Sequence, residues 1–389
     1  MNRQEQDNNF EEAMKHINAH GLDGMKDALE ILINTAMKIE RERHLGASRY
    51  ERTEERLGYS NGFKPKTVKT RLGVLNLEVP QVRDSTFYPS SLEKGVRSER
   101  ALRVALAEMY FQGVSTRKVT SIMEELCGTD VTSTQVSRAA AELDKEFDLW
   151  RNRPLGCYKY VFADARYESI RHGGSVIKCA VLTAIGISPD HKREVLGVSI
   201  ALSESEVHWR DFFKSLQTRG LHGIELIISD DHAGLKAARQ ALFPSIPWQR
   251  CQFHLQQNAQ AYVPKKDLKT KVAASIRSIF NAPNRTEAER LLNMAIEEYK
   301  KTAPLLSEWM SHNLTEGFTI FDFPQPHQKF LRTSNISERL NKEIKRRTRI
   351  ATIFPNVSSC LRLVTAVVLE ISEEWVTGAS YLHNLTKEE

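Results

Sequence analysis

Three acidic residues occupy positions in predicted strands and helices that need a chemical explanation. Asp164 lies inside a strand predicted over 158–165, although Asp is uncommon in strands. Asp230 follows the apolar run 226–229, at the carboxyl end of a strand, where α/β proteins hold their sites. Glu338 belongs to a predicted helix but lies off its apolar stripe. Each acid also has a structural interpretation: an exposed strand position, a turn or cap residue, and a Glu that caps its own helix.

Brought together, these three carboxylates predict a metal site. Two carboxylates about 4 Å apart repel by roughly 4 kcal/mol at an effective dielectric constant of about 20, so a divalent cation is needed between them. Ligands that are all oxygen favour Mg²⁺ or Mn²⁺. Two such ions about 3.5–4 Å apart activate a water or a 3′-hydroxyl and stabilise the leaving oxygen of a phosphodiester. The residue types therefore predict phosphodiester chemistry that depends on two metal ions.

Two features near the acids need separate interpretation. Asp231 adjoins Asp230, and because neighbours in a strand point to opposite faces, only one of them is expected to face a shared site. Cys251 and His254 form a single Cys-x-x-His pair. A structural zinc site needs four ligands, and the sequence has no second pair. We therefore expect a packing role for this pair rather than zinc binding.

The segments around the acids predict an α/β fold. Strands are expected at 158–165, 176–187, 194–202, 225–229 and 247–251, with helices at 208–220 and 235–242. This β-β-β-α-β-α-β order predicts a mixed sheet, because short connections favour an antiparallel meander and helical crossovers favour parallel pairing. The pattern over 256–330 predicts an all-α insertion, with a capping box at 286–289 and a strand signal only at 318–321. Helices beginning near 335 and covering 358–375 close the chain.

The first part of the chain predicts a DNA-binding region that is mainly α-helical. Residues 1–45 have helical periodicity, 67–79 alternate like a hairpin arm, and Asn61-Gly62 is a turn signal. The window 41–71 has nine Lys and Arg residues against four Glu, with aromatics between them, as on nucleic-acid surfaces. A solvated face with scattered ion pairs is the alternative.

Residues 115–143 have the outline of a helix-turn-helix, whose second helix would enter a major groove. Many helical hairpins share this outline. Gly128 lies in the turn, and Thr132 or Ser133 is expected to cap the second helix. A further basic window, 338–349, has six Lys and Arg residues against two Glu. The predicted DNA contacts are Arg52, Arg56, Lys64, Lys66, Arg71, Arg117, Gln135, Arg138, Arg339, Lys345, Arg346 and Arg347.

The overall composition is that of an ordinary globular protein. The chain has 389 residues, of which 41% are hydrophobic and 27% charged, so it can form a sizeable core. The formal net charge of +6 is too small to identify a partner by itself. Five cysteines without a Cys-x-x-Cys pair do not form a disulfide scaffold, and the polar first 20 residues do not resemble a signal peptide. The longest apolar stretch, 176–187, is too short to span a membrane, so we expect a cytoplasmic protein.

Motifs over residues 50–376 resemble those of a known family. Around the acids they read Asp164-Ala165-Arg166-Tyr167, with Ala165 where glycine is usual, Ser229-Asp230-Asp231-His232-Ala233-Gly234, and Asn335-Ile336-Ser337-Glu338-Arg339. Further matches lie at 50–62, 70–73, 79–80, 109–117, 136–138, Trp209, 219–221, 248–254, 354–356 and 373–375. Gln257-Asn258 stands where the family usually has Arg-Asn. Together these motifs resemble the Mutator-type transposases of bacterial insertion sequences, which carry a DDE triad on an RNase H-like fold.

The resemblance implies a DNA transposase with Asp164, Asp230 and Glu338 as catalytic residues and ligands of two Mg²⁺ or Mn²⁺ ions. It implies that Cys251, His254 and Trp209 lie near the active site and support it. The implied partners are double-stranded DNA, as terminal inverted repeats and target, and a second copy in a homodimer, in a bacterial cytoplasm and bound to the nucleoid. The alternatives are a catalytically inactive transposase that only binds DNA and a carboxylate-pair hydrolase of the glycosidase type.

The expected domain organisation follows from these patterns. Residues 1–92 form the basic N-terminal region and 93–153 the helix-turn-helix region. An RNase H-like catalytic core begins at 154–255, is interrupted by the helical insertion 256–330, and is completed by 331–389, which contains the third acid.

Overall fold

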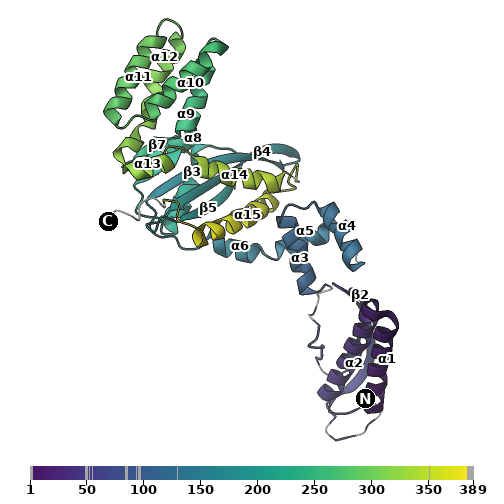
Figure 1. Cartoon of the computed structure of the whole chain (residues 1–389). Coiled ribbons are helices and arrows are strands. Elements are labelled where there is room, and N and C mark those ends of the chain that lie inside the picture. Colours follow the sequence, from purple (N-terminus) through teal and green to yellow (C-terminus); the bar gives the residue numbers. More distant parts are fainter. Residues whose placement is uncertain are drawn as a thin grey trace. The chain divides into compact units, whose positions relative to one another are not determined.

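The computed structural model divides the chain into two compact units, Met1–Glu142 and Leu143–Glu389 (Figure 1). It describes residues 3–48, 51, 53–54, 56–83, 86–92, 94, 98–128, 130–349 and 351–382. The boundary after Glu142 corrects the predicted boundary after 153, because helix α6 (Asp144–Arg151) belongs to the second unit. Asp144 accepts two hydrogen bonds of 2.6 Å from Arg362, which fix α6 to the last helix of the chain.

The first unit begins with a helical pair that packs on a β-hairpin. The helices are α1 (Arg3–His20) and α2 (Met25–Leu45), joined by the short 3-10 helix η1 (Gly21–Gly24), as the helical periodicity predicts. Strands β1 (Tyr59–Thr70) and β2 (Gly73–Arg83) pair antiparallel. Met37 of α2 packs with Leu75, Leu77 and Val79 of β2, and these apolar residues form the core beneath the hairpin.

The hairpin corrects the predicted turn at Asn61-Gly62. The chain reverses between Thr70 and Gly73, and Asn61-Gly62 lies inside β1, where the pairing register shifts between Ser60 and Phe63. Gly62 has φ +72°, a left-handed conformation that glycine adopts without strain and that suits a bulge as well as a turn.

The remaining helices of the first unit confirm the helix-turn-helix outline. They are α3 (Arg100–Phe111), α4 (Thr116–Cys127) and α5 (Ser133–Ala141). Gly128 ends α4 in the left-handed conformation. Thr132 caps α5 and forms a reciprocal capping box with Gln135, which settles the choice between Thr132 and Ser133.

The second unit is built on a five-stranded mixed sheet in the order β5-β4-β3-β6-β7. The strands are β3 (Tyr160–His172), β4 (Ser175–Ile187), β5 (Arg193–Ala201), β6 (Leu226–Ser229) and β7 (Trp248–Arg250). Helices α7 (Glu206–Thr218) and α8 (Ala233–Leu242) complete the predicted β-β-β-α-β-α-β order. The first three strands pair antiparallel, β6 pairs parallel to β3, and β7 pairs parallel to β6, as the connection lengths predict.

Strand alternation sends side chains of β3 to two differently covered faces. Val161 and Ala163 pack in the cluster that contains Trp209, Phe212 and Phe213 of α7. Asp164 points to the other face. Helices α14 (Asn335–Thr348) and α15 (Val357–Thr377) cover that face, where Ile170 bridges to Phe354 in the loop between them (Figure 1).

Helices fill the segment between β7 and α14, which confirms the helical insertion. They are α9 (Gln252–Ala259), α10 (Lys266–Phe280), α11 (Arg285–Tyr299), α12 (Pro304–Asn313) and α13 (Gln325–Leu331), with 3-10 turns η2 (Gln260–Tyr262), η3 (Leu314–Gly317) and η4 (Thr319–Asp322). Two local predictions are wrong. Asn284, which accepts from the Glu287 N–H, caps α11 in place of the 286–289 box, and 318–321 enters η4 rather than a strand. No helix among the described residues is long and apolar enough to cross a membrane.

Candidate active site

Asp164 is fixed on β3 by two hydrogen bonds. Its Oδ1 accepts from the Ala165 N–H at 2.8 Å, and its Oδ2 accepts from Asn341 Nδ2 of α14 at 2.8 Å. Burial raises the pKa of its carboxyl to about 7, and the nearby carboxylates of Asp230 and Glu204 add to the rise, while the Ala165 N–H and His254 oppose it. The carboxyl therefore needs a positive partner in order to ionise fully at neutral pH.

Asp230 follows β6 and lies beside the Cys-x-x-His pair. Its Oδ1 is 3.8 Å from Nδ1 of His254, which stands in the first turn of α9. Interaction with Cys251 raises the pKa of His254 to about 9, with further contributions from Asp230 and Asp164. His254 is thus a cation at neutral pH and lies beside Asp230, one of the three predicted catalytic acids.

Cys251 is fully buried and joins His254 to the start of α14. Its sulfur accepts from the backbone N–H and the hydroxyl of Ser334, at 3.3 and 3.2 Å. Burial alone would raise the pKa of the Cys251 thiol, but interactions with His254 and Ser334 outweigh it and lower that pKa. Because Ser334 directly precedes α14, Cys251 ties the β7 end of the sheet to the helix that carries Glu338.

The neighbouring Asp231 is engaged in a separate ion-pair cluster. It lies 3.0 Å from Arg250, whose side chain is only 3% exposed, and 3.4 Å from Lys236. Arg250 and Lys236 both also contact Glu316. These contacts engage Asp231 in its own cluster, whereas Asp230 is the aspartate that lies beside His254.

Glu338 lies in the first turns of α14 and does not act as its cap. The helix begins at Asn335 after Ser334, which makes no side-chain cap, and the Glu338 N–H bonds to the Ser334 carbonyl. The Oε1 of Glu338 is buried without a hydrogen-bond partner. Asn341, three residues on and therefore on the same helix face, is the residue that bonds to Asp164. The capping alternative is therefore wrong.

Three contacts hold α14 against β3. Besides the bond from Asn341 to Asp164, Arg166 donates to the Asn341 carbonyl, and the Thr348 hydroxyl donates to buried Glu168 at 2.9 Å. Arg166 also pairs with Glu168 at 2.6 Å. The side chains of β3 that alternate with its core residues thus position the helix that carries Glu338.

Glu204 is an acid of this region that the sequence did not reveal. It follows β5, its side chain is 10% exposed, and it lies 3.3 Å from His232 and accepts from the Tyr167 hydroxyl at 3.1 Å. Burial raises the pKa of Glu204, and the carboxylate of Asp230 adds to the rise. The nearby indole N–H of Trp209 lowers this pKa, although it forms no hydrogen bond of normal geometry. Trp209, predicted as a supporting residue, is fully buried in the core cluster, and its indole lies near Glu204.

The backbone of Glu204 is fixed by its close approach to Gly234. A Cβ at Gly234 would lie 2.5 Å from the Glu204 carbonyl oxygen, so only glycine lets the start of α8 meet the β5–α7 loop. The signal that could have found Glu204 is that β5 runs parallel to β6, so both end at the same edge of the sheet. Among the described residues, no three His, Cys, Asp or Glu side chains converge closely enough to hold a metal ion as they stand.

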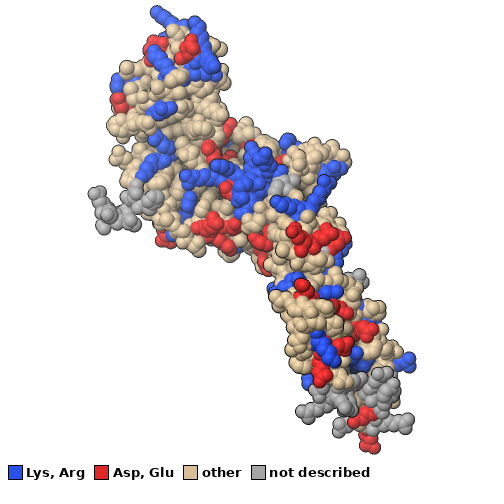
Figure 2. All heavy atoms as spheres, turned by 45° about the vertical axis from the view of Figure 1, so that its right-hand side comes forward, with Lys and Arg blue, Asp and Glu red and all other residues tan. Residues whose placement is uncertain are grey.

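The predicted DNA contacts of the second unit divide into exposed and buried residues. Arg339, Lys345 and Arg346 are exposed on α14, and Arg346 pairs with Glu343 at 2.8 Å on the surface. Figure 2 shows Lys and Arg gathered at the level of α14. Arg347 is 6% exposed and pairs with Glu370 of α15 at 2.8 Å. The prediction that Arg347 contacts DNA is therefore wrong, because its charge is used between two helices.

The predicted DNA contacts of the first unit differ in exposure and in the contacts that their side chains make. Lys64, Arg71, Arg117 and Arg138 are exposed. Arg71 also pairs with Glu99 at 3.3 Å, three further predicted contacts are engaged elsewhere, and Arg52 lies outside the described residues. Arg56 lies over the Tyr59 ring and donates to the Gly58 carbonyl, Lys66 donates to the Tyr88 hydroxyl at 2.8 Å, and Gln135 accepts from the Thr132 N–H at 2.9 Å in the capping box.

Comparison with known proteins identifies the class of protein. Residues 1–378 match the family described as "Transposase, Mutator family". The chain is 56% identical over 378 residues to the transposase for insertion sequence element IS406 of Burkholderia multivorans, covering 97% of each chain. It is 37% identical over 371 residues to the transposase for IS256 in transposon Tn4001 of Staphylococcus aureus, covering 94% of each.

The chain therefore belongs to the Mutator family of transposases, which confirms the resemblance seen in its motifs. A third relative, the transposase for IS1081 of Mycobacterium tuberculosis, is 34% identical over 92% of this chain and 87% of its own. Among solved structures, a chain of the simian T-cell lymphotropic virus intasome in complex with PP2A regulatory subunit B56 gamma covers 53% of this chain and 66% of its own. It has 10% identity and a TM-score of 0.17, a similarity too weak to bear on the fold.

Proposed function

We propose that the chain is an active DDE transposase that binds the ends of its insertion sequence as a homodimer and cleaves and transfers DNA strands. The observation that carries this proposal is the hydrogen bond from Asn341 to Asp164, because it fastens the face of α14 that bears Glu338 to the strand that bears Asp164. Family membership and the mixed order of the sheet support it, and we interpret the sheet as an RNase H-like core.

The donor atoms near this contact suit two Mg²⁺ or Mn²⁺ ions. Glu338 Oε1 is buried without a partner, and burial, with the neighbouring carboxylates of Asp230 and Glu204, raises the pKa of Asp164. Asp164, Asp230 and Glu338 would hold the ions through oxygen, which hard divalent cations prefer. Bound ions supply activation of a water or 3′-hydroxyl and stabilisation of the leaving oxygen.

The chain's own residues would prepare this chemistry. His254, a cation beside Asp230, would limit repulsion between the acids before DNA binds. Asn341 would orient Asp164, and would release Oδ2 when that oxygen is needed as a ligand. The exposed cations of α14, Lys345 and Arg346, would contact phosphates beside the acids.

The test is cleavage of end-labelled DNA that carries the ends of the insertion sequence, with Mg²⁺, by wild type and Glu338→Gln. We expect the variant to lose cleavage by at least about a thousandfold while it still binds the DNA, since electrostatic stabilisation in an active site is worth that much. Glu308→Gln, at an exposed position of α12, is the control and should cleave. Cleavage by Glu338→Gln at the wild-type rate would refute the triad, and a wild type that binds but does not cut would favour the inactive DNA-binding alternative.

A further inference from the structure

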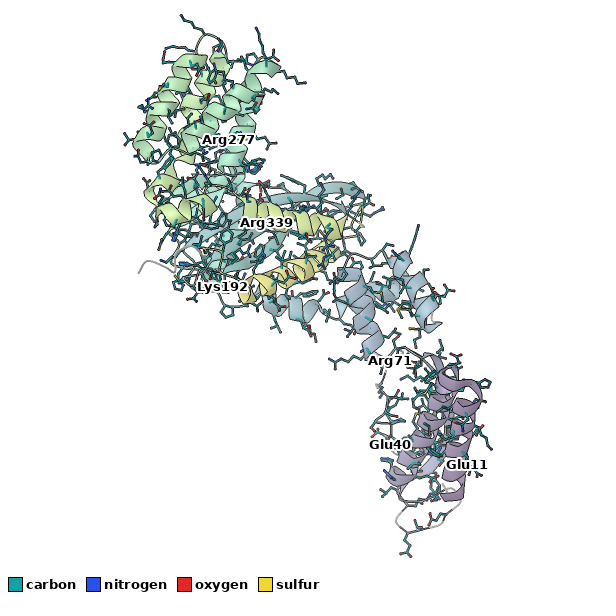
Figure 3. The ribbon with its side chains drawn as sticks, viewed as in Figure 1. Glu11, Glu40, Arg71, Lys192, Arg277 and Arg339 are labelled. Atoms are coloured by element: carbon teal, nitrogen blue, oxygen red, sulfur yellow. The ribbon has the colours of Figure 1, made fainter. Side chains whose placement is uncertain are left out.

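A basic hollow lies beside α14, the helix that carries Glu338. It has a volume of about 410 Å³, and its cations are Arg193, Lys329 and Arg339. A second hollow of about 570 Å³ shares Arg193 and Arg339 and adds Lys342. Figure 3 shows Arg339 on α14. We call the two hollows together the α14 groove.

The cations of the first hollow lack compensating acids. Its lining residues include neither Asp nor Glu. Burial lowers the pKa of Arg193, and the charge of Arg339 lowers it further, which shows that the two guanidinium groups repel each other. The Nε of Arg193 is buried without a hydrogen-bond partner. The second hollow carries Glu374 and Glu343, and the latter is paired with Arg346. An anion in the first hollow would relieve this repulsion.

The geometry of Arg193 is suited to a phosphate. Its guanidinium lies 4.9 Å from the centre of the Trp375 ring and 5.1 Å from that of Tyr381. Stacking on aromatic rings fixes the plane of the guanidinium and leaves its edge donors for an oxyanion, to which arginine binds in a bidentate manner. The side chain is thus held in place before any ligand arrives, which reduces the entropy cost of binding.

The position of the groove relative to the acids follows from helix geometry. Residues 335, 336, 339, 340, 342 and 343 of α14 line the groove, whereas Asn341 bonds to Asp164 and residue 338 shares its helix face. At about 100° per residue, these two faces lie roughly 150° apart around α14. The groove is therefore about one helix width, or ~10 Å, from the acids. That distance corresponds to about three base-pair steps of DNA, at ~3.4 Å each.

We propose that the α14 groove binds the phosphodiester backbone of DNA a few nucleotides beyond the scissile phosphate. This inference rests on the proposed function. Two DNA segments offer the same chemistry at that position: the flank that adjoins the element before cleavage, and the target DNA during strand transfer. Arg339 and Lys329 provide the exposed charges of the groove, and Arg193 provides its fixed donor.

The test measures binding of the full chain to three DNAs without divalent cations, so that it does not depend on cleavage. The first is an element end with ten nucleotides of flank, the second ends one nucleotide beyond the scissile phosphate, and the third is a joined end-target DNA. For the double variant Lys329→Gln/Arg339→Gln we expect about tenfold weaker binding to the flanked end, to the joined DNA, or to both, and a salt slope smaller by about two. Binding to the short end should stay at the wild-type value. Weaker binding to the flanked end would identify the flank as the DNA segment that the groove binds, and weaker binding to the joined DNA would identify the target.

Two further variants keep the test specific. Lys300→Gln/Lys301→Gln removes the same charge from the surface of the helical insertion. It should leave the difference in affinity between the short and the flanked DNA unchanged. Arg193→Lys keeps the charge but removes the planar donors, and should weaken binding to the longer DNAs alone. Equal loss on all three DNAs, or no loss on any, would overturn the proposal. Failure of wild type to cleave would count against the proposed function and would leave these binding results standing.

Discussion

The carboxyl of Asp164 is partly shielded from water and lies near two other acids, so its ionisation opposes folding when no cation is bound. Its pKa is raised to about 7 in the folded protein, from an ordinary value of 3.8. A raised carboxyl pKa means that the folded state holds its proton more tightly than the unfolded state. The resulting stability is complete below about pH 4 and is lost as the pH rises to about 7.

We therefore expect Asp164→Asn to be more stable than wild type at pH 8 in the presence of a chelator, and similar to it at about pH 3.5. The gain should be about 1–3 kcal/mol, because one pKa unit corresponds to about 1.4 kcal/mol and residual solvent contact reduces the effect. Thermal unfolding at the two pH values measures it. Asp267→Asn, on an exposed first turn of α10, is the control and should show no such dependence. A variant less stable than wild type at pH 8 would contradict this account.

The sequence singles out the three acids and His254 as candidate site residues, whereas Glu204 is indicated only by the directions of the strands and the role of Arg347 by nothing in the sequence. Asp164 and Asp230 attract attention because acids are rare within and just after apolar strands. Glu204 lies in a polar loop, where an acid is ordinary, and its burial depends on tertiary contacts such as those with His232 and Tyr167. Arg347 is one of several cations in a row, and only the packing of α15 distinguishes it from Arg346.

At the scale of single elements, α14 combines a structural arginine and a surface arginine at adjacent positions. Arg347 is buried against Glu370, whereas Arg346 is 59% exposed. We expect Arg347→Ala to lower the free energy of unfolding by about 1–3 kcal/mol, because it leaves Glu370 unpaired although partly solvated. Arg346→Ala should change it by less than about 0.5 kcal/mol and should weaken DNA binding instead.

Chemical denaturation of both variants, together with DNA binding at several salt concentrations, separates these two effects. The salt slope should fall by about one for Arg346→Ala, and should stay constant for folded Arg347→Ala. If Arg347→Ala lowered the salt slope and Arg346→Ala lowered the free energy of unfolding, α14 would present a different face to DNA.

Helix α5 divides its residues in a similar way between folding and recognition. Gln135 accepts from the Thr132 N–H, and the Thr132 hydroxyl accepts from the Gln135 N–H, so both side chains are committed to starting the helix. We expect Gln135→Ala to cost about 0.5–1 kcal/mol of stability in the first unit. Arg138→Ala should leave stability unchanged, weaken DNA binding, and lower its salt slope by about one. Thermal unfolding and a binding titration measure both, and equal stability loss in the two variants would argue against this division.

Most helices and strands were predictable, because long apolar runs and apolar residues at helical spacing are compatible with few other secondary structures. The run at 226–229 lies in a strand buried on both sides, and the strand order follows from connection lengths. Short signals failed where tertiary contacts decide. Asn61-Gly62 is compatible with a turn and with a bulge, and the pairing with β2 selects the bulge. The apolar 318–321 packs into the core of the insertion, where a 3-10 turn suffices.

At the scale of the whole molecule, each unit has its own hydrophobic core. Met37 is fully buried between α2 and β2 in the first unit, and Trp209 is fully buried between α7 and the sheet in the second. The sequence predicted this organisation only approximately, because α6 has the composition of a helix that could belong to either unit. Its two bonds from Arg362 assign it to the second.

Two separate cores predict two cooperative unfolding transitions in scanning calorimetry. Trp209→Ala should lower only the transition of the second unit, by roughly 10 °C, because loss of a buried Trp costs about 3–5 kcal/mol and each kcal/mol shifts Tm by about 2–4 °C in a unit of this size. Met37→Ala should lower only the other transition, since its cost of about 2–5 kcal/mol falls on the core under the hairpin. The two variants control for each other. If each of them moved both transitions together, the chain would unfold as one unit, and the units would not have independent cores.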